Sequence, residues 1–435
     1  MKSLGLDIGT TTICAAVMEH GQVLTALNLP NSAFLPADHA YERIQDTAYI
    51  RDTAMQAVNR MLQEHPDVCC IGVTGQMHGI VYLDREGNPV SPLYTWQDGR
   101  GDLPFRDGET YAQYLSRISG HAVSTGYGLV THFYNLQNQL VPSNAAVFCT
   151  IHDYLAMLLS GRTTPVTDPS DGASFGFFRV EEGCFDTEAL TRLGIDTCLL
   201  PQLAEDPCIG CFRGNIPVYV AIGDNQASFL GATGGRTDAM LVNMGTGGQF
   251  SAYTAHYLSC PGLETRPFPG GYLLVGSSLC GGRAYALLER FFRSVAIALT
   301  GHGMEDCYEA MDRLLSQTPC PEDMPTVIPL FQGTRQEPAL RASVTGLSPE
   351  NFTPEHMIWG MLYGMAQELH QMYSKYRDAG GAASALIGSG NGLRKNRHLQ
   401  NCFTQLFGRP LQMSAVEEEA AAGAAVFAAN CFQGE

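Results

Sequence analysis

The chain has 435 residues, of which 45% are apolar and 16% are charged. This length and composition predict two globular domains, each with its own core. The 26 basic and 43 acidic residues give a net charge of −17, which argues against nucleic acid or an anionic membrane as a partner. An anionic ligand would therefore depend on local hydrogen-bond donors, helix or turn dipoles, or a metal cation.

The N-terminal residues do not form a signal peptide, and no apolar run reaches the roughly 20 residues of a membrane helix. These features predict a cytoplasmic protein. The 14 cysteines are scattered along the chain, so we expect reduced thiols in the core rather than disulfides. Cys208 and Cys211 have C-x-x-C spacing, but no second pair accompanies them, and incidental thiols are the favoured interpretation.

Strands and helices alternate along the chain. The elements predicted up to residue 233 are strands at 4–6, 12–17, 69–73, 80–83 and 218–222, with helices at 49–63, 111–118, 152–159 and 227–230. Those predicted after it are a strand at 240–242, helices at 283–300, 354–379 and 417–430, and a strand at 386–387 that enters a Gly-rich turn. This alternation predicts an α/β architecture with two similar domains, 1–233 and 234–435.

Two short segments, far apart in the chain, have nearly the same sequence. Asp7, Gly9 and Thr10 correspond to Asn243, Gly245 and Thr246, and each segment lies between two predicted strands. We call residues 9–12 (Gly9, Thr10, Thr11, Thr12) the first phosphate turn and residues 245–247 (Gly245, Thr246, Gly247) the second phosphate turn. Backbone N–H groups and hydroxyls in such hairpins are suitable donors to a polyphosphate lining a cleft. Neither turn is a P-loop, because no Gly-Lys-Ser/Thr follows it.

Phosphoryl transfer also needs a magnesium ligand and a base for the acceptor. Asp7 is a candidate for Mg²⁺, through water, although a carboxylate here could also cap the turn through its own backbone. Asp224 follows an apolar strand, where open α/β sheets place their ligands, and is the best candidate base. A purely turn-forming Asp-Asn pair is an equal alternative for Asp224 and Asn225.

Three further segments suit a carbohydrate and a nucleoside. His78 lies in a Gly-bracketed loop, residues 75–79, which we call the sugar loop, and could hydrogen-bond a sugar hydroxyl or serve a structural role. Trp96 has the aromatic face that stacks on sugar C–H groups, although Trp is equally a core residue. The turn at 388–392, which contains Gly390 and Asn391, would allow close approach of an adenosine or simply end a strand.

These motifs occur in a fixed order: Asp7–Thr11, Gly75–Gly79, Trp96–Arg100, Gly223–Asn225, Asn243–Gly247, Gly333–Arg335, Thr345–Ser348, Gly388–Asn391 and Glu419–Ala425. In this order they resemble the FGGY carbohydrate kinases, a branch of the actin-like ATPase superfamily. The resemblance implies two ribonuclease-H-like domains that close a cleft over ATP, Mg²⁺ and a sugar. One motif departs from the family pattern: many relatives have Glu before Arg335, where this chain has Thr334.

The resemblance also implies residue roles. Asp224 would be the general base, Asp7 would help to hold Mg²⁺, and both phosphate turns would hold ATP. The sugar would contact Gln76, Met77, His78, Trp96 and Asn225, and adenosine would lie near Gly390 and Asn391.

Within the family, segments 124–132 and 171–178 most resemble the sedoheptulose kinases, which form sedoheptulose 7-phosphate. Xylulose, ribulose or another ketose or polyol is the alternative substrate. A different alternative is an ATP switch or sugar sensor without kinase activity. Asp224 beside a complete sugar loop argues against it, because a switch needs no base. The expected partners are small molecules only, and the chain is expected to be a monomer or homodimer.

Overall fold

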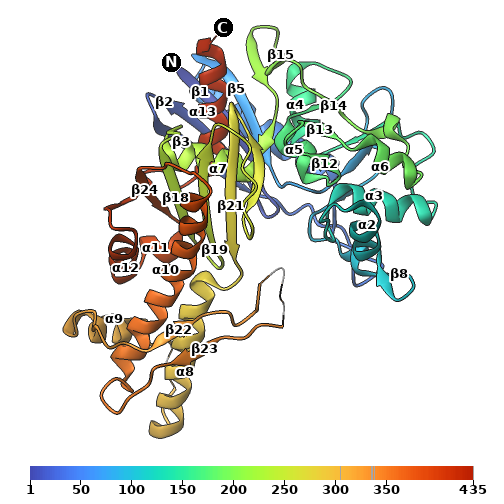
Figure 1. The fold of residues 1–435 in the computed structure, drawn as a ribbon. Helices are drawn as coiled ribbons and strands as arrows, with labels where there is room; N and C mark the ends of the chain where they lie inside the picture. Colours follow the sequence, from blue (N-terminus) through green and yellow to red (C-terminus); the bar gives the residue numbers. More distant parts are fainter. Residues whose placement is uncertain (304, 335–336, 338, 435) are drawn as a thin grey trace. The chain divides into compact units, whose positions relative to one another are not determined.

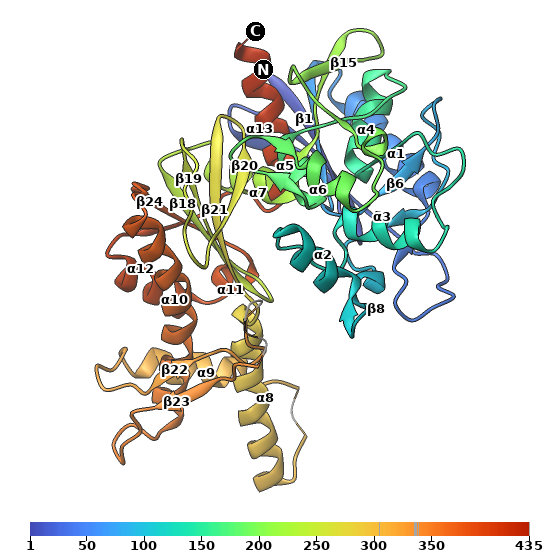
Figure 2. The ribbon, with the colours of Figure 1, turned by 45° about the vertical axis from the view of Figure 1, so that its right-hand side comes forward.

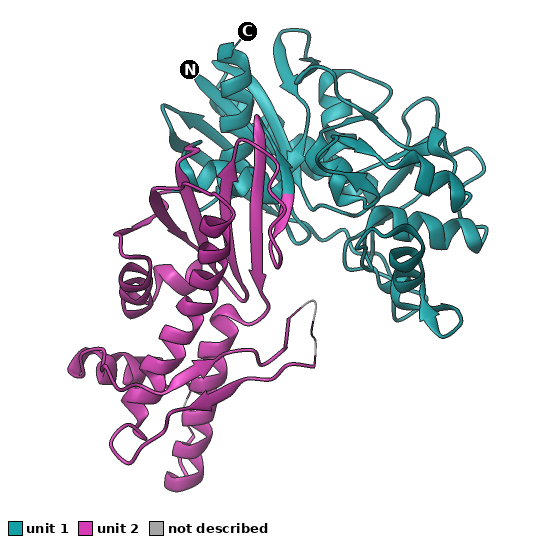
Figure 3. Cartoon of the chain, in the orientation of Figure 1, with its two compact units in different colours: residues 1–235, 266–269, 416–435 teal, residues 236–265, 270–415 magenta. Residues whose placement is uncertain are grey.

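The structure is a computed structural model that describes residues 1–303, 305–334, 337 and 339–434. Arg335 of the Gly333–Arg335 motif lies outside the described residues. The chain divides into two units, coloured in Figure 3: unit 1 is residues 1–235, 266–269 and 416–435, and unit 2 is residues 236–265 and 270–415. The division falls near the predicted boundary after residue 233, but the C-terminal helix belongs to unit 1.

A mixed sheet forms the centre of unit 1. Its strand order is β15-β16-β5-β1-β2-β3, and β17 also pairs with β5. The strands are β1 (Lys2–Ile8), β2 (Thr12–Glu19), β3 (Gln22–Pro30), β5 (Val68–Gly75), β15 (Cys208–Phe212), β16 (Ile216–Tyr219) and β17 (Ile222–Gly223). The strand predicted at 218–222 is interrupted after Tyr219, where the Val220 N–H donates to the Pro207 carbonyl (2.8 Å), and β17 begins at Ile222.

Helices and short strands surround this sheet. The helices are α1 (Thr47–Glu64), α2 (Tyr111–Ser119), α3 (Gly128–Gln137), α4 (Ile151–Ser160), α5 (Pro169–Ser174), α6 (Thr187–Arg192), α7 (Asp224–Thr233) and α13 (Glu419–Gly434), with 3-10 turns at Gly99–Asp102 and Thr197–Leu199. The short strands are β4 (Ile44–Gln45), β6 (Val81–Leu83), β7 (Leu93–Tyr94), β8 (Pro104–Arg106), β9 (Glu109–Thr110), β10 (Val147–Cys149), β11 (Val166–Thr167), β12 (Phe178–Arg179), β13 (Cys184–Phe185) and β14 (Gln202–Leu203). A second apolar cluster in unit 1 joins α2, α3 and α6 through Leu115, Phe133 and Leu190.

Helix α13 packs directly against β1, β5 and α7, as Figure 1 shows. Small residues permit this contact: a Cβ at Gly231 of α7 would lie 2.0 Å from the Glu419 carbonyl oxygen. A Cβ at Gly423 of α13 would lie 1.7 Å from the Ala227 carbonyl oxygen. The backbones of α7 and α13 therefore touch, and the position of α7 depends on glycine at this contact.

Unit 2 is built on another mixed sheet, in the order β20-β21-β19-β18-β24-β25. Its strands are β18 (Ala239–Met244), β19 (Gly248–Thr254), β20 (Glu264–Phe268), β21 (Gly271–Ser278), β24 (Ala385–Ser389) and β25 (Leu411–Met413), with a separate hairpin of β22 (Thr326–Ile328) and β23 (Ser343–Thr345). The helices are α8 (Gly281–Thr300), α9 (Tyr308–Gln317), α10 (Pro354–Asp378), α11 (Asn391–Arg394) and α12 (Arg397–Phe407). The long helix α10 runs from this sheet to α9 and the β22–β23 hairpin (Figure 2).

Candidate active site

Three parallel strand ends of unit 1 meet at one edge of the sheet. Ile8 of β1 pairs with Gly75 of β5, and Gly75 pairs with Gly223 of β17. Because these ends are in register, the first phosphate turn, the sugar loop and Asp224 follow the strands at the same edge. The structure thus brings together three segments that the sequence identified separately.

Asp224 is the first residue of α7 and is partly exposed. The helix was expected to begin at Ala227. It begins at Asp224 instead, because extended Gly223 (φ −58°, ψ 148°) caps it and a carboxylate is favourable in a first helical turn. Burial raises the pKa of Asp224, although the positive charges of His152 and Arg266 oppose the shift. The carboxylate is therefore a stronger base than an exposed aspartate.

The residues after Asp224 differ in their hydrogen bonding. The Asn225 side-chain oxygen is buried and has no hydrogen-bond partner among the described residues. The Gln226 side-chain oxygen is also buried without a partner among the described residues, but the Gln226 amide donates to the Pro267 carbonyl (2.8 Å). A buried acceptor without a protein partner is suited to a ligand hydroxyl, so Asn225 fits the predicted sugar contact.

Asp7 lies in a cluster of acidic side chains. Burial, followed by the negative charges of Asp224 and Glu418, raises the pKa of Asp7 to about 7. Carboxylate oxygens that repel one another in this way fit a divalent cation, which would favour the ionised form. No group of three or more His, Cys, Asp or Glu residues within the described ranges is arranged to hold a metal ion.

The side chain of Gln45 joins the first phosphate turn to the sugar loop. Its amide donates to the Thr10 carbonyl (2.8 Å), and its oxygen accepts from the Gln76 amide (2.8 Å). The Thr10 hydroxyl accepts from the Trp96 indole N–H (3.0 Å) and donates weakly to the Gln76 oxygen (3.4 Å). The sequence analysis missed Gln45, because its partners are far from it in the chain and only the fold brings them together.

The rest of the first phosphate turn presents donors to solvent. Thr11 and Thr12 are exposed. The Gly9 carbonyl accepts a hydrogen bond from the Asn31 side-chain amide (2.8 Å). The turn is therefore fixed on the protein side while its outer hydroxyls stay accessible.

His78 of the sugar loop adopts a left-handed backbone conformation, with φ at 72°. Its backbone N–H donates to the Ser174 hydroxyl (3.2 Å), and its Nδ1 lies 2.7 Å from the Ser174 carbonyl oxygen. The ring stacks on Tyr127 with centroids 4.5 Å apart. Because a carbonyl can only accept, Nδ1 carries the proton, and in the neutral ring Nε2 is an acceptor.

Met77 and Trp96 differ in exposure. Met77 is buried and packs beside Gly223, the residue before Asp224, since a Cβ at Gly223 would lie 2.5 Å from the Met77 methyl group. Trp96 has 46% of its surface exposed, so it is not a core residue. This exposure leaves its ring face open to a ligand.

A fully buried ionisable cluster lies near Asp224. His152 and Asp171 are 2.9 Å apart (Nε2 to Oδ1), and both are inaccessible to solvent. Burial lowers the pKa of His152 and raises that of Asp171, with nearby Asp168 and Asp224 raising the latter further. The pKa of Asp153 rises to about 8 through burial and repulsion by Asp171. This cluster was not predicted, because only the fold brings Asp171 close to His152.

The second phosphate turn joins β18 to β19 in unit 2. The N–H groups of Gly282 and Arg283, at the start of α8, donate to the carbonyls of Gly245 (2.9 Å) and Thr246 (3.1 Å). Asn243, the counterpart of Asp7, donates to the Ser389 hydroxyl (2.7 Å). The two turns thus share their hairpin form, but the second has an amide where the first has a carboxylate.

A cavity of about 1240 Å³ in unit 2 is lined by four of the five nucleotide residues predicted in that unit. Its lining includes Gly245, Thr246, Gly390 and Asn391, together with side chains of α8, α9 and α10. The turn predicted at 388–392 is only partly a turn, because Gly390 (φ 84°) caps the short helix α11 that begins at Asn391. This conformation favours glycine, and a Cβ there would also lie 2.7 Å from the Met244 carbonyl oxygen.

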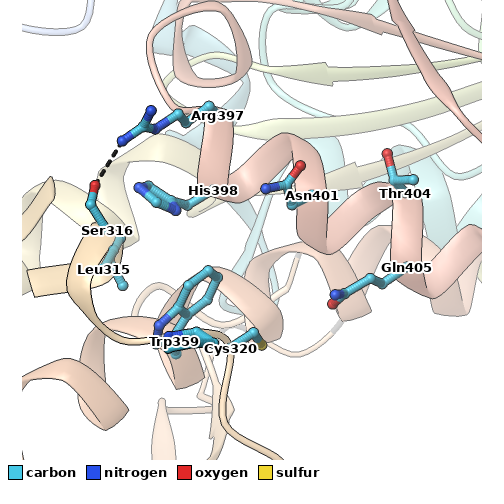
Figure 4. A pocket seen from close by; sticks show the side chains of 10 residues that line it. Leu315, Ser316, Cys320, Trp359, Arg397, His398, Asn401, Thr404 and Gln405 are labelled. Atoms are coloured by element: carbon cyan, nitrogen blue, oxygen red, sulfur yellow. Dashed lines mark hydrogen bonds between the residues drawn. The ribbon is translucent and has the colours of Figure 1, made fainter.

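A second cavity of unit 2, of about 620 Å³, contains none of the predicted residues (Figure 4). Trp359 lies on one side, and polar side chains of α12 line another. Arg397 donates to the Ser316 hydroxyl (2.7 Å), and His398 lies 3.2 Å from Asp312 of the larger cavity.

Comparison with known proteins gives the class of the protein. Residues 3–231 match the N-terminal domain of the FGGY family of carbohydrate kinases, and residues 240–431 match its C-terminal domain. The chain belongs to this family. It is therefore a sugar phosphotransferase that uses ATP as the phosphate donor, and the predicted two-domain α/β class is confirmed.

Two individual relatives and one solved structure show which sugar kinases the chain is similar to. The chain is 29% identical to the sedoheptulokinase of Mus musculus, over 98% of this chain and 96% of that protein. It is 24% identical to the xylulose kinase of Staphylococcus xylosus, over 98% of this chain and 90% of that protein. The crystal structure of xylulose kinase from Rhodospirillum rubrum matches with a TM-score of 0.83, covering 100% of this chain and 90% of that chain at 23% identity.

In the described part of the chain, no helix is both long enough and apolar enough to cross a membrane.

Proposed function

We propose that the protein transfers the γ-phosphate of ATP to a hydroxyl of sedoheptulose, with Asp224 as the general base. The observation that carries this proposal is the register of β5 and β17, which sets Asp224 beside the sugar loop. The substrate assignment draws on the 29% identity to sedoheptulokinase over almost the full length of both chains. Xylulose is the second candidate, because the chain is also similar to a xylulose kinase, at 24% identity over 98% of this chain.

In the proposed reaction, a sugar hydroxyl gives its proton to an Asp224 carboxylate oxygen. The hydroxyl oxygen forms a bond to the γ-phosphorus as the bond from that phosphorus to the β,γ-bridging oxygen breaks, and ADP leaves. The raised pKa of Asp224 supports this role, because it makes the carboxylate a better proton acceptor.

Side chains around Asp224 would hold the sugar. His78 would accept a hydrogen bond from a sugar hydroxyl at Nε2, since Nδ1 donates to the Ser174 carbonyl. The Asn225 oxygen would accept a second. Gln76 and Met77 would contact the sugar from the sugar loop, and the exposed Trp96 ring would cover its C–H groups.

ATP would be held by backbone and hydroxyl donors. Residues 9–12 and 245–247 would bind phosphates, and Gly390 and Asn391 would contact adenosine in the larger cavity of unit 2. Asp7 would hold Mg²⁺ through water, and the ion would neutralise charge on the phosphates.

An ADP-release assay across five- to seven-carbon ketoses and polyols tests the proposal. We expect the highest kcat/KM with sedoheptulose. Asp224→Asn should retain ATP and sugar binding, measured by calorimetry, while kcat falls about 10²- to 10⁴-fold. Near wild-type turnover by Asp224→Asn would overturn the base assignment, and preference for another sugar would overturn the substrate assignment.

A further inference from the structure

Helix α5 contacts both the sugar loop and the residue before the proposed base. Ser170 and Ser174 are four positions apart, so they lie on the same helical face. The Ser170 hydroxyl accepts from the Gly223 N–H (3.1 Å), and Gly223 precedes Asp224. The Ser174 hydroxyl accepts from the His78 N–H (3.2 Å), as described above. One short helix thus binds two segments that the chain separates widely.

The orientation of each serine is fixed by burial and further hydrogen bonds. Ser170 is 1% exposed and Ser174 is 4% exposed. The Ser170 hydroxyl donates to Asp168 (2.5 Å), which also caps α5, so an oxygen lone pair of Ser170 must face Gly223. An accepting hydroxyl oriented in this way defines where the backbone before Asp224 can lie.

Helix α5 lies in the interior of unit 1. Asp171, between the two serines in the sequence, has its Oδ1 2.9 Å from Nε2 of His152 in α4, and both side chains are fully buried. Ser170 and Ser174 therefore belong to a fixed element, separated by about 6 Å along its axis.

His78 needs an external restraint. A left-handed conformation in a residue other than glycine costs about 1–3 kcal/mol and persists only where the surroundings impose it. The two contacts with Ser174 hold the backbone and the ring of His78 in this conformation.

We propose that α5 is a positioning element that sets the separation between Asp224 and His78. Ser170 positions the base through Gly223, and Ser174 positions the sugar-binding histidine. This inference rests on the proposed function, because it assigns the two ends of α5 to proton transfer and to sugar binding. It makes the two serines positioning residues with separable effects.

Steady-state kinetics of two variants test the separation. Ser170→Ala should lower kcat about 10-fold or more with little change in sugar KM, because a displaced base impairs the chemical step. Ser174→Ala should raise sugar KM about 10-fold with a smaller change in kcat, because it leaves the His78 N–H without its acceptor. The KM for ATP should stay unchanged in both.

Ser160→Ala is the matched control. Ser160 is also buried, but its hydroxyl donates only to the Met157 carbonyl within α4 (2.9 Å). This variant should behave as wild type. The inference would be overturned if both α5 variants changed kcat and KM equally, or if neither variant changed. The proposed function would still stand in that case if wild type and Ser160→Ala released ADP in the presence of sugar.

A crystal structure of Ser174→Ala gives a readout that does not depend on activity. We expect the φ angle of His78 to leave the left-handed region. A His78 φ that stays near 72° without the Ser174 hydroxyl would overturn the inference even if no sugar proved to be a substrate.

Discussion

Replacing Gly423 by alanine tests whether the contact between α13 and α7 positions the proposed base. The new Cβ would lie 1.7 Å from the Ala227 carbonyl oxygen, and contacts under 3.0 Å are essentially never observed. The two helices would have to separate by roughly 1.3 Å, which weakens dispersion contacts along the whole interface. Overpacking of this kind costs about 1–3 kcal/mol, and the clash involves backbone that cannot rotate away.

Helix propensity acts in the opposite direction, since alanine is favoured over glycine within a helix by about 1 kcal/mol. We expect steric overlap to prevail, with a net loss of about 1 kcal/mol and a Tm lower by about 3 °C. Thermal unfolding followed by circular dichroism measures this change. Because α7 begins at Asp224, kcat should fall as well.

Gly434→Ala in the same helix is the control, because a Cβ there meets nothing within 4 Å. Its Tm and kcat should match those of wild type. A Gly423→Ala protein that is as stable as Gly434→Ala would refute the reasoning, because propensity alone would then account for both variants.

Three further predictions concern the site itself. The base must be ionised, so kcat should fall as pH decreases through the pKa of Asp224. Because burial raises this pKa, the fall should occur above the ordinary value of 3.8. A pH profile in which kcat stays flat down to about pH 4 would contradict this prediction. His78→Ala should raise sugar KM about 10-fold, the loss of one hydrogen bond, while ATP binding measured by calorimetry is unchanged; an unaltered sugar KM would contradict the assigned contact. Gln45→Leu removes the hydrogen-bond partner of the Thr10 carbonyl and of the Gln76 amide, at a cost of about 1–3 kcal/mol. This variant should raise KM for both ATP and the sugar. A rise in only one KM would show that Gln45 does not link the first phosphate turn to the sugar loop.

The sequence was sufficient for features that depend on local pattern. The two Gly-Thr turns join strands, and Asp224 follows a strand, because alternating apolar residues and glycine determine these features within a few positions. Helix α5 was not predicted, although Asp168 followed by Pro169 is a helix N-terminal signal. The helix is short, and its contacts with His78 and Gly223 come from tertiary structure.

The sequence was insufficient where a role depends on distant partners. Gln45 lies in a two-residue strand, and nothing in its neighbourhood indicates a fully buried amide that joins two loops. His152 was predicted to lie in a helix and Asp171 was not assigned to one, and only the fold brings them within 2.9 Å. Contacts of this kind join residues far apart in the chain, and no local pattern encodes them.

The exposure and charge of the residues at the proposed site explain how a strongly acidic chain can bring anionic ATP together with a neutral sugar. Some of the groups proposed to touch ligands are exposed and uncharged: Thr11 and Thr12 offer hydroxyl donors, and Trp96 offers an aromatic surface. The ionisable groups behind them are buried, and burial shifts the pKa values of Asp153 and Asp171 towards the neutral form. Neutral acids do not repel phosphate. Burial of Asp153 and Asp171 therefore reduces the negative charge presented near Asp224.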